Sequence, residues 1–511
     1  MNEHLYLPKK YNNPSRLLKA LRITSERSWI KAGERRVLEL FQEMAKRVPA
    51  YKDFLKKNKV DSLKIRSMAD FRQVQTIDKD NYLKEYPLEK LCWDGQFKNR
   101  RWVISATSGS TGKPFYFPRE RAQDLQYAAI AELYLLTNFD IRHRATLYID
   151  AFPMGVWIGG LFTYEAIKTI AERGKYHLSI ITTSVDKKEI INAIKKFGKA
   201  FDQIIVGCYG PFLKDVIDEG LLCGIDWKKY NLKFVFSAEG FSEEFRDYII
   251  QKTGLKDIYR GTLNHYGTVD QGTLAYETPI SILIRRIAVK KSPMLYENIF
   301  PKKNKLPTLC QFDPELFFFE QVSENLLCSS FSGLPLVRYD LKDYGGIIGY
   351  ETMIDKVKES GIDLIKELKT ATIENTVWRL PFVYVYERRD LSISLFAFQL
   401  YPEPIRRVLL RRQFNGSLTG KFTMITRYDH RANQFFELNI ELKPNIHKSE
   451  KLKTLIEEMV IECLLDENSE YRKTYADYPE ALRPHVVFWP HEHSAYFRSG
   501  GKQKWVSKEN K

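Results

Sequence analysis

The sequence predicts an α/β protein with a large N-terminal domain, built on mostly parallel sheets with flanking helices, and a small C-terminal α+β domain. Two observations predict this class. Short apolar strands alternate with helices from about Trp102 to Gly254, an order that builds a largely parallel sheet covered on both faces. The chain also has 511 residues, which is too long for one ordinary hydrophobic core, so at least two domains are expected.

The expected elements follow the chain in order. Residues 14–57 predict helices, because apolar residues recur at helical spacing until Pro49 interrupts the pattern. Ser242 is expected to cap a helix that ends at Gly254. The other elements expected in the alternating region are strands 102–106, 145–149, 177–182, 203–208 and 232–237 and helices 122–136, 161–172 and 187–197. The C-terminal part is expected to contain strands 422–427, 435–442 and 486–489 and a helix over 452–464.

Composition indicates a folded, soluble protein. Hydrophobic residues make up 44% and charged residues 28% of the chain, which is typical of globular proteins. The six cysteines include no C-x-x-C pair, a spread that favours buried thiols in a reducing compartment over a disulfide framework or a zinc site. The N-terminus has no signal-peptide core, and the most membrane-like stretch, residues 151–162, is too short to span a bilayer. A cytoplasmic protein without a membrane span is expected.

The formal net charge of +16 permits binding to nucleic acids or anionic surfaces. However, the basic residues are spread along the chain rather than gathered into an arm or a tail. A basic surface also suits an enzyme whose substrates are nucleotides. We therefore expect no nucleic-acid partner; the alternative would bind DNA or RNA with a steep salt dependence.

One loop, Ser105-Ala-Thr-Ser-Gly-Ser-Thr-Gly-Lys-Pro114, is rich in groups that bind phosphate. Glycines let the backbone approach an anion, and exposed N–H groups and hydroxyls donate to phosphate oxygens. A Walker loop requires a Gly at the place of Thr107 and a Ser or Thr at the place of Pro114, so this is a different kind of loop. The alternative is a plain polar hairpin. The candidate phosphate-binding residues are Thr107, Ser108, Gly109, Ser110, Thr111, Gly112 and Lys113.

This loop resembles the phosphate-binding signature of the acyl-adenylate-forming superfamily, which contains acyl-CoA synthetases, luciferases and peptide-synthetase adenylation domains. Residues 47–55 (RVPAYKDFL) and 152–160 (FPMGVWIGG) are similar to elements of its phenylacetate–CoA ligase and CapK-like branch. The resemblance runs in patches from about residue 47 to residue 506. It implies that further nucleotide-binding motifs lie downstream of the loop.

The stretch His265-Tyr-Gly-Thr-Val-Asp270 resembles the superfamily's Y-G-x-T-E motif, with Val269 in place of its Thr and Asp270 in place of its Glu. The resemblance implies that Tyr266 stacks on adenine, that Gly267 belongs to the nucleotide site, and that Asp270 faces magnesium. Taken alone, Asp270 would be a surface turn acid. Upstream, a segment similar to the adenine-lining G-A-E-P motif contains Ala238, Glu239 and Gly240.

Residues 335–343 (PLVRYDLKD) are similar to P-L-x-R-Y-x-x-G-D, whose last acid holds the ribose hydroxyls. Asp343 is therefore the expected ribose ligand, ahead of its competitor Asp340, and Lys342 stands where Gly is usual. A carboxylate can accept from both ribose hydroxyls at once.

Residues 387–391 (ERRDL) resemble the G-R-x-D-D hinge, with Glu387 and Leu391 as departures. This resemblance implies that Arg388 contacts ribose and that Asp390 is the pivot between a domain of residues 1–386 and one of residues 387–511. The similarity of residues 401–405 (YPEPI) to the branch supports this assignment. The alternative is an exposed charged turn.

Near the C-terminus, residues 498–504 (RSGGKQK) look like the superfamily's R-S-x-G-K-x-K motif. The resemblance implies that Lys502 is catalytic and reaches the reacting carboxylate and the α-phosphate, with Lys504 in reserve. A lysine-containing tail in isolation would simply be solvated. His491 and His493 lack a third nearby ligand and are not expected to bind metal. Phe152, Met154 and Trp157 line an acyl pocket or belong to the core.

The implied reaction is attack of a small-molecule carboxylic acid on the α-phosphate of ATP, with Mg2+ as cofactor, giving an acyl-adenylate and pyrophosphate. Transfer of the acyl group to a thiol, coenzyme A, would follow. The alternatives are transfer of AMP itself to a coenzyme, a ligase with a sugar or amine acceptor in surface-polysaccharide synthesis, and a degenerate nucleotide-binding protein without activity. The sequence identifies neither the acid nor the acceptor, and it leaves a homodimer open.

Overall fold

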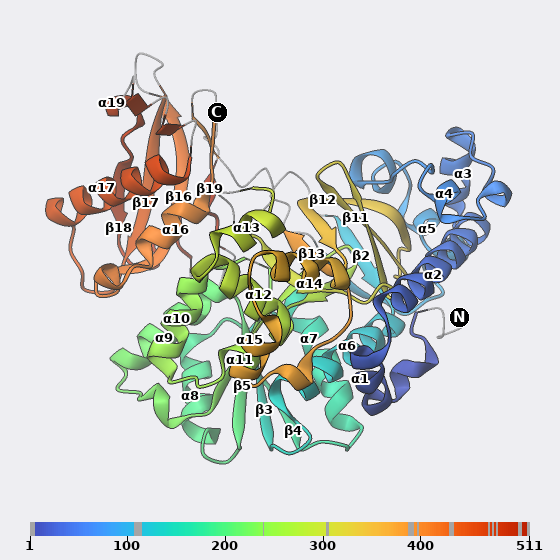
Figure 1. The fold of residues 1–511 in the computed structure, drawn as a ribbon, viewed down its shortest axis with the longest axis horizontal. Coiled ribbons are helices and arrows are strands. Elements are labelled where there is room, and N and C mark those ends of the chain that lie inside the picture. The colour runs from blue at the N-terminus through green and yellow to red at the C-terminus, as the bar shows by residue number, and fades with distance from the viewer. Residues whose placement is uncertain are drawn as a thin grey trace.

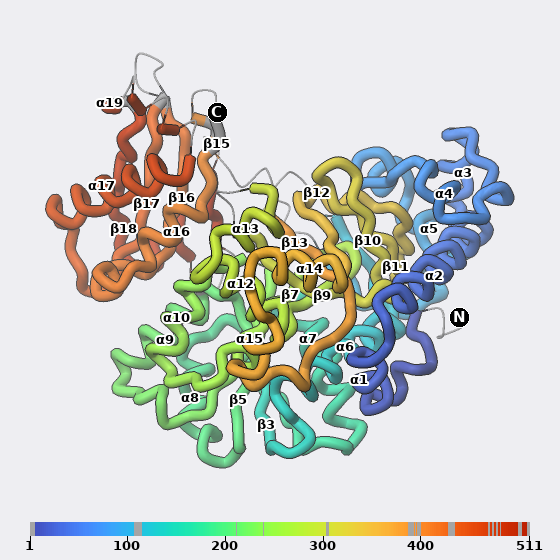
Figure 2. The backbone as a smooth tube through the Cα atoms, viewed as in Figure 1, coloured from blue at the N-terminus to red at the C-terminus, as the bar shows by residue number. Residues whose placement is uncertain are grey.

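The structure is a computed structural model that describes residues 6–106, 115–238, 240–302, 306–386, 393–395, 398–428, 434–468, 471–472, 475–476, 479–498 and 503–507. The chain forms a large α/β body and a smaller C-terminal α+β unit, so the predicted fold class is confirmed (Figure 1). Figure 2 shows the C-terminal part, coloured orange to red, at the opposite end of the molecule from the N-terminal helices α1–α3.

The N-terminal region is helical, as predicted. It contains α1 (Pro14–Ile23), α2 (Glu26–Arg47) and α3 (Pro49–Lys57). Pro49 is the first residue of α3, because a proline ring suits the first turn of a helix but blocks the interior. Shorter helices and helical turns connect this region to the sheet: η2 (Lys9–Asn12), η3 (Ser62–Lys64), α4 (Met68–Phe71), η4 (Lys79–Leu83), α5 (Leu88–Leu91) and η5 (Trp93–Gly95).

Among the described residues an 11-stranded sheet forms the centre of the large body. One half is parallel and has the order β4-β3-β5-β6-β7. Its strands are β3 (Thr146–Asp150), β4 (Leu178–Thr182), β5 (Gln203–Cys208), β6 (Leu232–Phe236) and β7 (Thr262–Thr268). The helices that alternate with them are α6 (Arg121–Phe139), α7 (Ile158–Glu172), α8 (Lys187–Phe197), α9 (Gly210–Leu222) and α10 (Glu243–Thr253). The predicted strands and helices of this region are confirmed.

Beyond β7 the sheet is antiparallel, which the alternation pattern did not predict. The order continues β8-β9-β13-β12-β11-β10. Antiparallel neighbours need only a short turn, whereas parallel strands need a crossover, and β7–β8 and β10–β11 are such hairpins. The strands are β8 (Gly272–Tyr276), β9 (Thr308–Gln311), β10 (Phe317–Val322), β11 (Asn325–Ser330), β12 (Leu336–Ile348) and β13 (Phe382–Val385). The remaining helices and turns are η6 (Trp227–Lys229), α11 (Ile258–Gly261), α12 (Pro279–Lys290), α13 (Pro293–Ile299), α14 (Tyr350–Glu359), α15 (Leu364–Thr370) and η7 (Glu374–Thr376).

Strands β1 (Val103–Ala106) and β2 (Tyr116–Arg119) pair antiparallel, with Ala106 opposite Tyr116. The candidate phosphate loop therefore starts and ends at adjacent positions of this two-stranded sheet. The loop itself lies outside the described residues.

The C-terminal unit has a hydrophobic core of its own. Its four-stranded sheet has the order β18-β17-β16-β19. The elements are β14 (Ile393–Leu395), β15 (Phe398–Leu400), α16 (Pro402–Leu409), η9 (Arg412–Phe414), β16 (Leu418–Tyr428), β17 (Gln434–Leu442), α17 (Glu450–Glu467), α19 (Pro479–Leu482), β18 (His485–Trp489) and β19 (Val506–Ser507). The predicted strands and long helix of this unit are confirmed.

Two sequence expectations concern individual side chains. Ser242 stands at the cap position of α10, but its hydroxyl makes no capping hydrogen bond, whereas Gly254 ends the helix in a left-handed conformation as expected. All six cysteines are free thiols; five are buried and Cys223 is exposed. Within the described residues, no helix combines the length and apolarity needed to cross a bilayer.

Candidate nucleotide-binding site

Tyr266 and Asp343, assigned to the base and the ribose, contact each other although they lie on different strands. The Tyr266 hydroxyl, on β7, donates to Asp343 Oδ2, on β12, over 2.7 Å. The Tyr266 ring also stacks on the Phe319 ring of β10, with centroids 6.2 Å apart. Burial, followed by the charge of Asp343, raises the pKa of Tyr266 well above its ordinary value, so its hydroxyl remains a donor.

Asp270 lies in the turn between β7 and β8 and is largely buried. Its Oδ2 accepts a hydrogen bond from the hydroxyl of Tyr339, and its Oδ1 is 3.3 Å from the ammonium of Lys79. A buried carboxylate held in this way is a suitable oxygen ligand for Mg2+. The described residues contain no group of three or more His, Cys, Asp or Glu side chains that could hold a metal ion. One carboxylate is enough to fit a magnesium ion, which is usually bound by one or two carboxylates together with phosphates and water.

The segment after β6 adopts an unusual backbone conformation. Ala238 has a φ of +73°, and the carbonyl of Gly240 accepts from Arg406 Nη1 over 3.4 Å. Glu239 lies outside the described residues. In the hairpin of β7 and β8, a β-carbon at Gly267 would come within 2.6 Å of the Gly272 carbonyl oxygen of β8. Glycine at position 267 is therefore required by the close approach of the two backbones.

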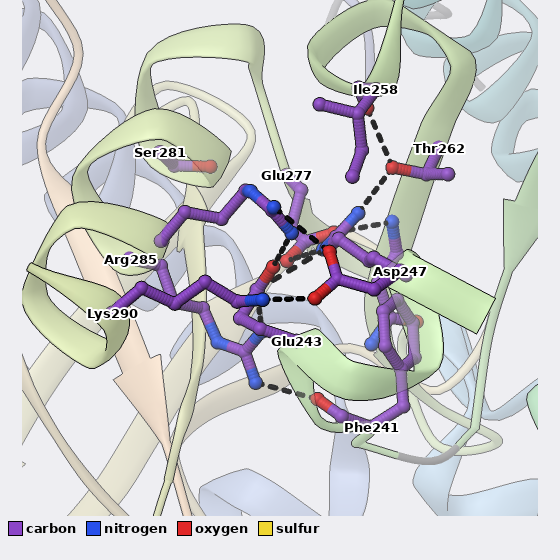
Figure 3. A network of polar contacts seen from close by, with 12 residues as sticks. Phe241, Glu243, Asp247, Ile258, Thr262, Glu277, Ser281, Arg285 and Lys290 are labelled. Atoms are coloured by element: carbon purple, nitrogen blue, oxygen red, sulfur yellow. Dashed lines mark hydrogen bonds and ion pairs between the residues drawn. The ribbon is translucent and has the colours of Figure 1, made fainter. Parts of the chain in front are cut away.

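A buried ionic network braces the same segment (Figure 3). Arg285 of α12 donates to the carbonyl of Phe241 over 2.6 Å, and the same guanidinium pairs with Glu243 at the start of α10. Arg246 pairs with both Glu243 and Glu277. The carboxyl edge of β6, where the adenine-lining segment was expected, is thus held by charged groups from two helices and the end of β8.

Lys342 occupies the position where the resembling motif has glycine, and its φ is +60°. The side chain donates to Asp78 Oδ2 over 2.6 Å and lies 3.0 Å from Asp340 Oδ2. Asp340 is thus engaged with Lys342, whereas Asp343 contacts Tyr266.

Several expected site residues lie outside the described part of the chain: Thr107, Ser108, Gly109, Ser110, Thr111, Gly112, Lys113, Glu239, Arg388, Asp390 and Lys502. The segment that follows Lys502 is described. Gln503 Nε2 donates to the Phe422 carbonyl over 3.0 Å, and Thr423 Oγ1 donates to the Lys504 carbonyl over 2.7 Å. The Lys504 side chain is exposed.

A cavity between the large body and the C-terminal unit has Gly240 and Phe241 on one side and Arg406 and Trp505 on the other. The Arg406 guanidinium lies 4.3 Å from the centroid of a Trp505 ring. Trp505 is three residues beyond Lys502. The end of the chain that carries the expected catalytic lysine therefore adjoins the expected adenine-lining segment.

Other candidates have simpler environments. Phe152 is buried, with its ring centroid 5.7 Å from that of Tyr209, and Trp157 is 40% exposed. His493 packs on the ring of Trp489. His493 thus belongs to no group of three or more His, Cys, Asp or Glu side chains among the described residues that could hold a metal ion.

Sequence reasoning missed Lys79, Tyr339 and His265 as contributors to this region. Tyr339 lies within residues 335–343, the stretch that resembles a ribose-binding motif. Its place in that motif could have identified it as a residue of the site. His265 precedes Tyr266 and is buried against Tyr134, with ring centroids 5.0 Å apart. Burial lowers the pKa of His265 to about 3, so its ring is neutral at neutral pH.

Comparison of the sequence with protein-family models and with curated proteins gives no significant match. Solved structures do match over nearly the whole chain. The 2-hydroxyisobutyryl-CoA ligase in the postadenylation state, in complex with R3-HIB-AMP, has a TM-score of 0.67 and 14% identity, covering 96% of this chain and 92% of that one. The GH3.15 acyl acid amido synthetase has a TM-score of 0.57 and 12% identity, covering 97% and 93%.

The chain has the fold of the acyl-adenylate-forming enzymes. Against the same CoA ligase in complex with 2-HIB-AMP and CoA in the thioesterification state, at 13% identity and equal coverage, the TM-score is 0.53. This structure therefore superposes better on the postadenylation structure of that ligase than on its thioesterification structure.

Proposed function

We propose that the protein is an ATP-dependent enzyme that converts a carboxylic acid into an acyl-adenylate with release of pyrophosphate. The hydrogen bond between Tyr266 and Asp343 carries this proposal, because it joins residues assigned independently to the base and the ribose of one nucleotide. The similar fold of a CoA ligase in complex with R3-HIB-AMP supports it.

In this proposal the protein's residues position the reactants and neutralise charge, since acyl activation needs little covalent work from the enzyme. The face of Tyr266 packs against adenine. Asp343 accepts from the ribose hydroxyls as well as from Tyr266, since a carboxylate offers about four lone-pair sites. Asp270 would hold magnesium, which supplies positive charge to the phosphates when bound. The loop Thr107–Lys113 would bind the departing pyrophosphate, and Lys502 would offset charge that grows between the carboxylate and the α-phosphate.

The acceptor of the acyl group is a separate question. Coenzyme A is the leading candidate, with rotation of residues 387–511 about Asp390 between the two half-reactions. The similarity to the postadenylation arrangement supports a first half-reaction in the present arrangement. An amine acceptor is the second candidate, supported by the similarity of the whole chain to an acyl acid amido synthetase. The phenylacetate–CoA ligase and CapK-like assignment rests on the sequence resemblance.

A panel of carboxylic acids incubated with ATP and Mg2+ tests the proposal, with pyrophosphate release measured and hydroxylamine as the trap. At least one acid should release pyrophosphate and give a hydroxamate. Lys502→Ala should abolish this release yet leave thioester formation from supplied acyl-adenylate largely intact; equal loss in both half-reactions would remove Lys502 from its role.

Other outcomes of the panel favour the alternatives. No release with any acid would contradict the proposal. A product that retains AMP would indicate adenylyl transfer, and the absence of ATP binding in calorimetry would indicate a degenerate protein.

A further inference from the structure

Lys79 is a cation at the edge of the candidate site that no motif brought to attention. It is the first residue of η4, and its Nζ lies 3.3 Å from Asp270 Oδ1 and 5.7 Å from the centroid of the Phe117 ring. Phe117 is on β2, the strand that follows the candidate phosphate loop. Lys79 therefore stands between the proposed metal ligand and the hairpin that carries the loop.

The backbone around Lys79 is fixed by the same strand that carries the ribose residue. Ile77 N donates to the Arg338 carbonyl over 3.2 Å, and Asp340 N donates to the Ile77 carbonyl over 2.8 Å. Asp78, the preceding residue, caps η4 and accepts from Lys342 over 2.6 Å. Two backbone bonds and one ion pair thus attach the turn to β12, next to Tyr339 and its partner Asp270.

The surroundings of Lys79 leave its ammonium able to change partners. Its side chain is 35% exposed, whereas that of Asp270 is 7% exposed. Lysine has a flexible four-carbon stem and three donors, so a small rotation can carry its charge from one anion to another. A metal ion bound to Asp270 would repel the ammonium, and a nearby phosphate would attract it.

From this geometry we infer that Lys79 binds the β- and γ-phosphates of ATP and pairs with Asp270 when no nucleotide is bound. The inference rests on the proposed adenylate-forming function and adds a phosphate-binding residue to it. A cation fixed beside the leaving pyrophosphate stabilises the charge that collects there during adenylation. Its contribution would come from a turn of the N-terminal region rather than from the candidate loop.

Calorimetry of Mg2+–ATP and of AMP with the full chain tests the inference. Lys79→Met should weaken ATP binding about tenfold or more, the loss expected for a charge-assisted contact to phosphate, and should change AMP binding by less than about twofold. Lys79→Arg should restore most of the ATP affinity, because it keeps the charge. Lys84→Met is the matched control, since Lys84 caps the same turn and pairs with Asp80 at 2.7 Å; it should change neither affinity.

The outcomes separate this inference from the function on which it rests. If the wild-type protein binds neither ATP nor AMP, the proposed function fails and the inference falls with it. If the wild type binds ATP but Lys79→Met leaves that affinity unchanged, or weakens ATP and AMP equally, the proposed function stands and Lys79 is only a structural ion pair. Thermal melting of each variant identifies a loss of affinity caused by unfolding, in which case Lys79→Gln replaces Lys79→Met in the same comparison.

Discussion

Lys342 combines a backbone conformation that favours glycine with a side chain that holds two acids. Its φ of +60° places it in the left-handed region, where a β-carbon costs about 1 kcal/mol. Burial lowers its pKa, but hydrogen bonds to Asp78 and Asp340 outweigh burial and raise the pKa overall. The side chain is 47% exposed, so this pairing stabilises the fold only modestly. The ion pair to Asp78 offsets the backbone strain and attaches the turn that carries Lys79.

Two substitutions at this position separate the strain from the ion pair. Both Lys342→Gly and Lys342→Ala remove the contacts to Asp78 and Asp340, but only alanine keeps a β-carbon at positive φ. We expect the glycine variant to be more stable than the alanine variant by about 1 kcal/mol. Urea unfolding of both variants at pH 7 measures the difference, with Asp78→Asn as a control that removes the ion pair alone. An alanine variant as stable as the glycine variant would show that the position carries no strain.

At this scale the sequence predicted some site residues and could not predict others. Tyr266 and Asp343 were identifiable because each lies in a contiguous stretch that resembles a motif. Lys79 was not, because its place depends on a bridge between Ile77 and Tyr339, residues far apart in the sequence. No local pattern of residue types reports such a contact.

The helices α10 and α12 are joined through a buried carboxylate. Glu243 pairs with Arg246 of its own helix and with Arg285 and Arg286 of α12. Burial alone would raise the pKa of Glu243, but the three guanidinium groups lower it to about 2. Figure 3 shows this network, in which Glu243 meets Arg285 of α12, whereas Glu277 pairs with Arg246 of α10. Because Arg285 also donates to Phe241, the network couples the packing of both helices to the segment at the end of β6.

Replacing this carboxylate should cost far more stability than replacing an exposed one. Glu243→Gln leaves three arginines without their shared anion, and we expect a loss of about 3 kcal/mol at pH 7. The matched control is Asp247→Asn on the same helix, whose carboxylate is 43% exposed; its loss should stay below about 1 kcal/mol. Equal losses in urea unfolding would contradict the special role of Glu243.

The same residue predicts a pH dependence. The pKa of Glu243 in the folded protein is below its ordinary value of 4.5, so its contribution is complete above that pH and is lost as the pH falls toward 2. Between pH 7 and pH 3 the wild type should lose about 2 kcal/mol of stability through this group. Glu243→Gln should lack that component. The measurement is the free energy of unfolding of both proteins at pH 7 and at pH 3, compared between the two proteins.

Among the elements, periodicity predicted the strands and helices of the parallel half of the sheet. The parallel half of the sheet follows from strands and helices that alternate along the chain. In the antiparallel half, β9 lies between β8 and β13, and β13 follows β12 only after two helices. Strands that pair across such long connections do not alternate regularly with helices, so the sequence pattern did not predict the sheet between residues 258 and 386.

At the scale of the whole molecule, charged residues join the two parts of the chain. Two acids of α9 meet lysines of the C-terminal unit: Asp215 pairs with Lys421 of β16, and Asp218 pairs with Lys443 at 2.8 Å. Lys421 also lies 3.5 Å from Glu441 of β17. Burial lowers the pKa of Lys421, but Asp215 and Glu441 outweigh it and raise the pKa overall. Farther along, Lys187 of α8 pairs with Glu219 at 2.8 Å and with Glu492 at 2.6 Å.

These contacts differ in burial, and burial determines how much each contributes to the association of the two parts. Asp215 and Lys421 are only 3% and 7% exposed, whereas Lys443 is 18% exposed and its partner Asp218 also holds Lys214. Removing one member of a buried pair leaves an uncompensated charge, which costs about 3 kcal/mol or more, whereas removing both members costs much less. The pair of Asp215 and Lys421 should therefore control how the C-terminal unit sits on α9.

Lys421→Met should consequently shift the C-terminal unit away from α9, and adding Asp215→Asn to it should restore part of the original arrangement, because Glu441 still lacks its cation. Cys223, the exposed thiol at the end of α9, and a cysteine introduced at the exposed Lys451 of α17 give a labelled pair for energy transfer across the interface. We expect lower transfer in Lys421→Met, transfer between that of Lys421→Met and the wild type in the double variant, and little change in the control Lys443→Met. If the shift occurs, the proposed function predicts slower adenylation without slower thioester formation from supplied acyl-adenylate, because the proposal places only the first half-reaction in the present arrangement. Unchanged transfer in Lys421→Met would mean that contacts other than this buried pair hold the two parts together.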